Sequence, residues 1–146
     1  MTWKELLDKK LADRHKTSGE ELTDLRNAIE RNLDDAAVSQ LSADNRFGLA
    51  YEAALLLAKM AIASAGYRVK GQGAHHTTFV ALKLALGPSV NETANYLERC
   101  RRTRNKLSYD AAGIATDQDA TELLAKATAL QETVKQWIAS NHPDLK

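Results

Sequence analysis

The stretch Phe47-Gly-Leu-Ala-Tyr-Glu-Ala-Ala-Leu-Leu-Leu-Ala-Lys-Met-Ala-Ile-Ala-Ser-Ala-Gly66 is the most hydrophobic part of the chain. Its apolar residues recur three and four positions apart, which predicts a helix, and further leucines occupy the remaining sides. A helix that is apolar on most sides is usually central to its bundle. Ser42 precedes the stretch as a candidate N-cap, and Gly66 follows it as a natural stop. We therefore expect a long helix at the centre of a helical domain.

Capping patterns predict helices on the N-terminal side of this stretch. Thr2-x-x-Glu5 is a capping box that opens an N-terminal extra helix, and Ser18-x-x-Glu21 opens a long helix with one apolar face. The long helix is expected to reach about Val38, with residues 34–35 as the place where a break could fall.

The C-terminal side is organised in the same way. After the loop expected at residues 67–76, a shorter helix is predicted over residues 77–86, ending at Gly87-Pro88. Ser89-x-x-Glu92 opens a helix expected to end at residues 109–113, and Thr116-x-x-Asp119 opens the last one, which residues 141–143 terminate.

The fold class that follows is all-α. We expect an antiparallel up-down bundle of about four long helices, with a short helix and the N-terminal extra helix. The whole chain, residues 1–146, is expected to form one domain with its core at about residues 18–140. Two prolines, seven glycines and few β-branched runs agree with helix rather than sheet.

Composition narrows the class of protein. Apolar residues make up 44% and charged residues 27% of the chain, as in ordinary soluble domains. No run approaches 18 apolar residues, the first residues lack a signal-peptide core, and a single cysteine fits a reducing compartment. We therefore expect a cytoplasmic protein with no membrane partner. The net charge of +1 excludes a general polyanion binder but allows a local basic strip.

Such a strip exists, and we call residues 99–106 the basic segment. It holds Arg99, Arg101, Arg102, Arg104 and Lys106. In the structural interpretation Arg99, Arg101, Arg102 and Lys106 form a solvated face, with Arg101 and Arg102 pairing with a nearby carboxylate such as the one at position 98. In the functional interpretation they face RNA.

Arg104 is the unusual member, because helical spacing places it on one face with Leu97, Cys100 and Leu107. A guanidinium on an apolar face is costly unless it is paired or the face opens onto a groove. A structural Arg104 would need a carboxylate, with Glu52 a candidate. A functional Arg104 would meet a phosphate with its bidentate fork, supported by the neighbouring residue 105 as a neutral donor and acceptor.

The pattern Arg-Arg-x-Arg-Asn-Lys-Leu-x-Tyr at residues 101–109 resembles the signature of HEPN domains, which are all-helical bundles. Residues 44–61, followed by Gly66-Tyr-Arg and Gly73-Ala-His-His, are similar to the SAV-6107-like subfamily of these domains. The resemblance covers about residues 18–138.

This resemblance implies a metal-independent endoribonuclease without a cofactor. The arginine and histidine of two protomers would form one cleft, in which a ribose 2′-hydroxyl attacks the adjacent phosphate. Carried over by position, the arginine is Arg104, its polar follower is Asn105, and the histidine position holds Tyr109. Tyrosine titrates near 10 and histidine near 6.5, so Tyr109 is a poor base and favours RNA binding over cleavage.

The resemblance also implies a setting and partners. The implied setting is a toxin–antitoxin or phage-defence system. The implied partners are RNA, a second copy of the chain as a homodimer, and a small nucleotidyltransferase antitoxin that could modify Tyr109. The alternative interpretation is a non-enzymatic helical module for dimerisation or interaction.

His75 and His76 form the second candidate site. Adjacent residues point in different directions, so the pair is a weak metal signal, and we expect no metal site. One histidine could cap the next helix or pack against Tyr67. Alternatively, one lies near Arg104, contacts RNA and supplies the missing acid or base. A small-ligand pocket between Tyr51, Tyr67 and His75 is a weaker option.

Overall fold

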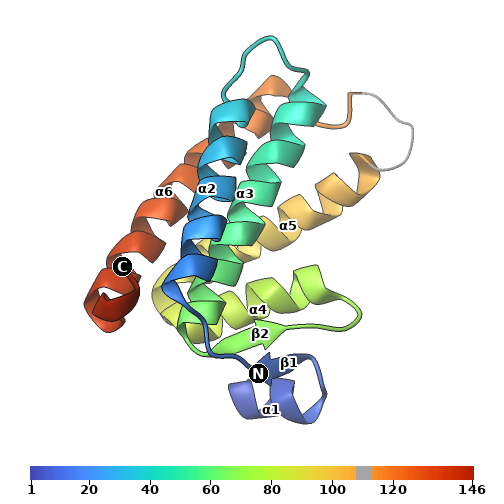
Figure 1. Cartoon of the computed structure of the whole chain (residues 1–146). Helices are drawn as coiled ribbons and strands as arrows, with labels where there is room; N and C mark the ends of the chain where they lie inside the picture. Colours follow the sequence, from blue (N-terminus) through green and yellow to red (C-terminus); the bar gives the residue numbers. More distant parts are fainter. Residues whose placement is uncertain (108–112) are drawn as a thin grey trace.

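The computed structural model describes residues 1–107 and 113–146, and within them the fold is an all-α bundle, as predicted (Figure 1). Its helices and strands, in chain order, are α1 (Trp3–Asp8), β1 (Ala12–Arg14), α2 (Gly19–Ala36), α3 (Ala43–Ser64), β2 (Tyr67–Val69), α4 (Ala74–Leu86), α5 (Asn91–Leu107) and α6 (Asp117–Asn141). Short 3-10 turns occupy Pro88–Val90 and Pro143–Leu145.

Helix α3 is the centre of the bundle, with α2 and α6 packed along it and α4 and α5 covering the remaining sides (Figure 1). This confirms the expectation drawn from its apolar stretch. By length and composition α3 could cross a membrane, but 72% of its most apolar window is buried among the other helices. A core helix of a soluble protein has these properties.

The predicted N-caps are formed for four of the helices. The side chains of Thr2, Ser18, Ser42 and Thr116 accept hydrogen bonds from backbone N–H groups in the first turns of α1, α2, α3 and α6, respectively. Thr116 also completes its capping box, because the Asp119 carboxylate accepts the Thr116 N–H at 3.0 Å. Local capping chemistry therefore sets where these helices begin.

Three expectations about element boundaries were wrong. Helix α2 continues through residues 34–35 to Ala36 without a break. Residues 67–76 are not one loop, because Tyr67–Val69 forms β2 and α4 begins at Ala74. Helix α5 begins at Asn91 after a 3-10 turn, and within the described residues Ser89 caps neither the turn nor the helix. The expected end of α5 falls largely on residues 108–112, outside the described residues.

The unexpected strand β2 pairs antiparallel with β1, aligning Ala12 with Val69 and Arg14 with Tyr67. Beside this pair, Trp3 of α1 stacks on Tyr67 with ring centroids 3.9 Å apart. A small second core joins α1 and β1 to the ends of α3 and α4, and consists of Leu6, Ala12, Ile62 and Ala81. The N-terminal segment is thereby fixed to the bundle.

Candidate functional site

The basic segment on α5 does not form one face. Arg99 lies over the ring of Tyr96 at 5.7 Å, next to α6. Arg101 and Arg104, three residues apart, lie close enough to Tyr51 of α3 and His75 of α4 for their charges to affect both side chains. Arg102 and Lys106 are exposed to solvent. Helical geometry thus divides the five cations among different surroundings.

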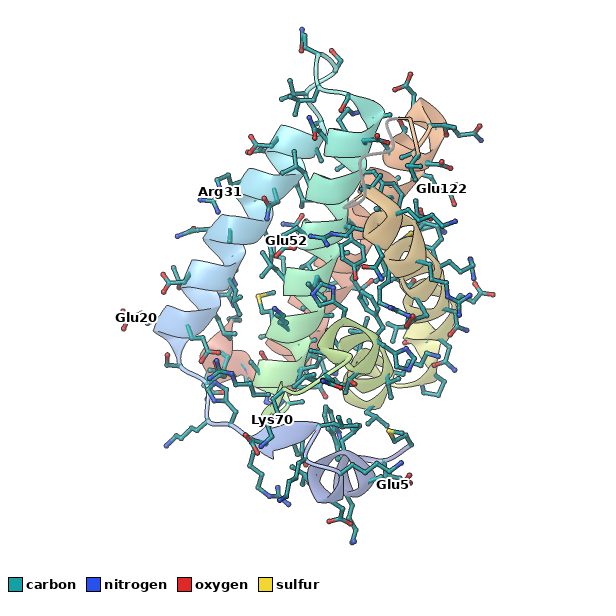
Figure 2. The ribbon with its side chains drawn as sticks, turned by 90° about the vertical axis from the view of Figure 1, so that its right-hand side faces the viewer. Glu5, Glu20, Arg31, Glu52, Lys70 and Glu122 are labelled. Atoms are coloured by element: carbon teal, nitrogen blue, oxygen red, sulfur yellow. The ribbon has the colours of Figure 1, made fainter. Side chains whose placement is uncertain are left out.

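Arg104 is half-buried, as its position on the apolar stripe predicts, since Leu97 and Cys100 on the same face are buried. The structural interpretation proposed Glu52 of α3 as its partner (Figure 2). Within residues 1–107 and 113–146, neither Glu52 nor any other carboxylate forms an ion pair with Arg104. The Glu52 partnership is therefore absent, and among the described residues no carboxylate neutralises the Arg104 guanidinium.

His75 is bonded to the core of the protein. Its Nδ1 atom lies 3.2 Å from the hydroxyl of Tyr51, a residue that is fully buried on α3. Phe79, one turn further along α4, contacts the Tyr51 ring edge-on at 6.0 Å. Tyr51 is thus held between α3 and α4, and it fixes the position of the imidazole at the start of α4.

Burial has the largest effect on the pKa of both members of this pair. Burial is the main cause that lowers the pKa of His75 below its usual 6.5, and Lys59 and Arg104 lower it further, with Glu52 in opposition. Burial raises the pKa of Tyr51, while Arg101 and Arg104 oppose the rise. At neutral pH the pair therefore consists of an uncharged imidazole and an uncharged phenol beside two arginines.

His76 has a different role, because it points to Glu98 of α5. Its Nδ1 atom lies 2.6 Å from one carboxylate oxygen of Glu98, and Arg101 Nε donates to the other at 2.5 Å. Burial raises the pKa of Glu98, but the bonds to His76 and Arg101 outweigh burial and hold the pKa below its usual value. This triad joins α4 to α5 and partly neutralises Arg101, as the structural interpretation expected for Arg101.

The candidate site therefore gathers Arg104 and Arg101 from α5, His75 from α4 and Tyr51 from α3. The expectation that a histidine could cap the following helix was wrong, because the N-cap is Gly73, without a side-chain bond. Two further expectations were also wrong, namely that a histidine packs against Tyr67 and that Tyr51, Tyr67 and His75 line a common pocket. Tyr67 stacks on Trp3 beyond the end of α3, about 20 Å of helix rise from Tyr51.

The remaining predicted residues lie at the margin of the site. Asn105 is exposed on the last turn of α5, and Tyr109 is among residues 108–112, outside the described residues. In the described part of the chain, no group of three or more His, Cys, Asp or Glu residues is arranged to hold a metal ion.

The sequence indicated that Glu98 could pair with Arg101, but it did not indicate that Glu98 also binds His76 or that the Tyr51 hydroxyl binds His75. Tyr51 lies within the apolar stripe of α3, where an aromatic ring is expected. Its hydroxyl was the feature of the sequence that could have indicated a polar contact at this position. A buried phenol requires a hydrogen-bond partner, and a polar residue from another helix has to provide it.

No family model, no curated protein and no solved structure matches this chain. The class that fold and site define is an all-α bundle carrying a cluster of arginine, histidine and buried tyrosine at the junction of α3, α4 and α5.

Proposed function

We propose that the protein is a HEPN-like helical protein that binds RNA at the junction of α3, α4 and α5, with Arg104 contacting a backbone phosphate. The observation that supports this proposal is the half-buried Arg104 guanidinium, which has no carboxylate partner in the described part of the chain and whose charge lowers the pKa of His75. A guanidinium in partly apolar surroundings binds a phosphate more strongly than one in water, because the local dielectric constant is lower.

The neighbouring charges favour an anion at this place. Arg101 shares Glu98 with His76, so its charge is partly compensated, whereas Arg104 has no such compensation within the described residues. Arg102 and Lys106 extend the positive surface along the exposed side of α5. A single strand of RNA presents one phosphate per nucleotide, and Arg102 and Lys106, one helical turn apart, would contact further phosphates of such a backbone.

The resemblance to HEPN domains adds RNA cleavage as the reaction to test. A base would take the proton of a ribose 2′-hydroxyl, and its oxygen would form a bond to the adjacent phosphorus. The bond to the 5′-oxygen would break, which leaves a 2′,3′-cyclic phosphate and, after proton transfer, a 5′-hydroxyl. Arg104 would stabilise the charge on the phosphorane, and no metal is required.

The biological setting belongs to the same proposal. We place the protein in the cytoplasm, in a toxin–antitoxin or phage-defence system, as a homodimer. Its other partner would be a small nucleotidyltransferase antitoxin that modifies Tyr109.

The first prediction concerns Arg104. We expect Arg104→Ala to weaken binding of a fluorescent single-stranded RNA by about tenfold or more, because a hydrogen bond to a charged group contributes about 1.5–3 kcal/mol. Arg31→Ala is the matched control, since Arg31 is exposed on the outer side of α2 (Figure 2). Fluorescence anisotropy at fixed salt measures the affinity, and thermal melting by circular dichroism checks that both variants fold.

Equal losses in the two variants would contradict a specific role for Arg104. Cleavage is measured with the same RNA in the presence of EDTA, with and without the Arg104 substitution. A wild-type protein that neither binds nor cleaves RNA, but sediments as a dimer, would instead support the non-enzymatic dimerisation module.

A further inference from the structure

The contact between Tyr51 and His75 determines where the imidazole proton lies. Tyr51 is fully buried, and within the described residues its hydroxyl has a single hydrogen-bond partner, His75 Nδ1 at 3.2 Å. If the hydroxyl donates to Nδ1, its hydrogen is satisfied and the neutral imidazole carries its own proton on Nε2. If Nδ1–H donates instead, the hydroxyl hydrogen is left buried without an acceptor, which is unfavourable.

We propose that Tyr51 is a positioning residue that holds His75 as the Nε2–H tautomer, so that Nε2–H donates to a phosphodiester oxygen bound by Arg104. The inference rests on the proposed function for its ligand, but the tautomer is a property of the protein alone.

The surroundings of His75 support a neutral donor. The groups whose charges act on it are Lys59 and Glu52 of α3 and Arg101 and Arg104 of α5. Burial first, and then Lys59 and Arg104, lower the pKa of His75, so the ring is uncharged near neutral pH. A neutral N–H donor, together with an arginine that has no carboxylate partner within residues 1–107 and 113–146, suits the single negative charge of a phosphodiester.

The adjacent histidine cannot take this role in the same way. His76 is committed to Glu98 at 2.6 Å, and its side chain is 57% exposed, whereas His75 is held by a buried residue. Two neighbouring histidines thus have separate functions: His76 connects α4 to α5, and His75 presents one N–H to the site. A donor held in place by the core loses little entropy when it binds its ligand.

Nuclear magnetic resonance of the full chain with 15N-labelled histidine tests the tautomer directly. We expect the His75 ring to show the Nε2–H pattern at pH 7.5, with an unprotonated Nδ1. In Tyr51→Phe, which removes only the hydroxyl, the two tautomers should become mixed. Tyr96→Phe is the matched control, because Tyr96 lies on α5 next to α6, and it should leave the pattern unchanged. An Nδ1–H pattern in the wild-type protein would overturn the inference.

A titration with dimethyl phosphate, a small monoanionic phosphodiester, tests the ligand. We expect the His75 Nε2–H resonance to shift on addition of this probe in the wild-type protein and to remain unchanged in Arg104→Ala. No shift in the wild-type protein would overturn the assignment of Nε2–H as a phosphodiester donor, whether or not the tautomer is as expected.

Two substitutions separate positioning from folding. In His75→Asn, the side-chain amide would provide a carbonyl acceptor for Tyr51 without a donor in the place of Nε2, so RNA affinity should fall at least threefold with little change in stability. Tyr51→Phe should lower RNA affinity by a smaller factor, because a mixed tautomer still presents the donor part of the time.

If His75→Asn binds RNA as well as the wild-type protein, His75 is not a donor to the ligand. If RNA fails to bind the wild-type protein while dimethyl phosphate still shifts His75, the proposed function fails and the inference about the site stands.

Discussion

Two half-buried arginines in this protein have opposite surroundings. Arg46 donates to the carbonyl of Ala36 at 3.0 Å and to Thr121 Oγ1 at 3.3 Å, and it lies 3.8 Å from the Asp117 carboxylate. It thereby connects α2, α3 and α6. Arg104 has no such partners in the described part of the chain, although it is also partly removed from water. The contrast identifies Arg46 as structural and agrees with the proposed role of Arg104 in binding an anion.

Asp44 provides a second structural contact at the residue scale. Its carboxylate accepts the backbone N–H of Gly113 at 2.9 Å and that of Ala115 at 2.8 Å. These bonds hold the residues that precede α6 against the start of α3. Because Asp44 is partly buried, the bonds are not fully replaced by water when the carboxylate is removed.

We predict that Asp44→Ala lowers the free energy of unfolding by about 1–3 kcal/mol, as expected for the loss of hydrogen bonds to a charged group. Urea denaturation followed by circular dichroism measures the change. Asp24→Ala is the control, since Asp24 is exposed on α2 and should change stability by less than about 0.5 kcal/mol. Similar effects of the two substitutions would show that the Asp44 contacts do not stabilise the fold.

At the element scale, α3 owes its central place to small residues as well as to large ones. Ala50, Ala53, Ala54, Ala58 and Ala61 are all completely buried. Small side chains allow neighbouring helices to approach closely, and they occur on several sides of α3. An apolar pattern of this kind gives no single face, so the sequence predicts burial without indicating which neighbour lies on which side.

Because the alanines of α3 are buried among other helices, we predict that replacing them with larger side chains destabilises the protein. We expect Ala54→Leu to cost about 1–3 kcal/mol of stability, because the fully buried position would have to accommodate an added isopropyl group. Ala125→Leu, at an exposed position on α6, should be close to neutral. Urea denaturation of both variants measures the difference, and an unchanged stability of Ala54→Leu would indicate unfilled space beside α3.

Helix α4 shows why element boundaries were harder to predict. Gly73 has a φ of +69° and Gly71 a φ of +85°, values that glycine adopts readily. The turn they form places the first residues of α4, including both histidines, against α3 and α5. The pairing of β2 with β1 joins residues more than fifty positions apart, and no local pattern indicates that pairing.

At the scale of the whole molecule, the candidate site exists only because three helices meet. Tyr51 comes from α3, His75 from α4 and Arg104 from α5, and no two of them are neighbours in the sequence. The bundle excludes water from Tyr51 while leaving Arg101 and Arg104 partly exposed. The pKa of His75 therefore reports on the packing of all three helices.

The lowered pKa of His75 predicts that the free energy of unfolding depends on pH. Because the folded-state pKa of His75 is lowered, the unfolded chain binds a proton more readily as the pH falls below about 6.5, and the free energy of unfolding decreases. Above that pH the effect of His75 is absent. Glu98, whose pKa is lowered from 4.5, loses its stabilising contribution only at lower pH.

Urea denaturation at pH 7.5 and 5.5 measures this dependence. We expect the wild-type protein to be less stable at pH 5.5, and His75→Asn to show a smaller difference between the two values. His142→Asn is the control, because His142 lies at the C-terminal end of α6, away from the site. An equal pH dependence in the wild-type protein and His75→Asn would contradict a neutral, partly buried His75.

The sequence by itself determined the helical class, the central position of α3 and the start of four helices. These properties depend on local periodicity and on capping bonds between residues three positions apart, so a short stretch contains all the information they need. It also identified Arg104 as exceptional, because helical spacing alone places it on an apolar face. Only the tertiary structure decided that Glu52 does not pair with Arg104, that His75 rather than His76 faces Tyr51, and that β2 pairs with β1. Those outcomes depend on how helices distant in sequence are oriented against one another, and many side-chain contacts together fix that orientation.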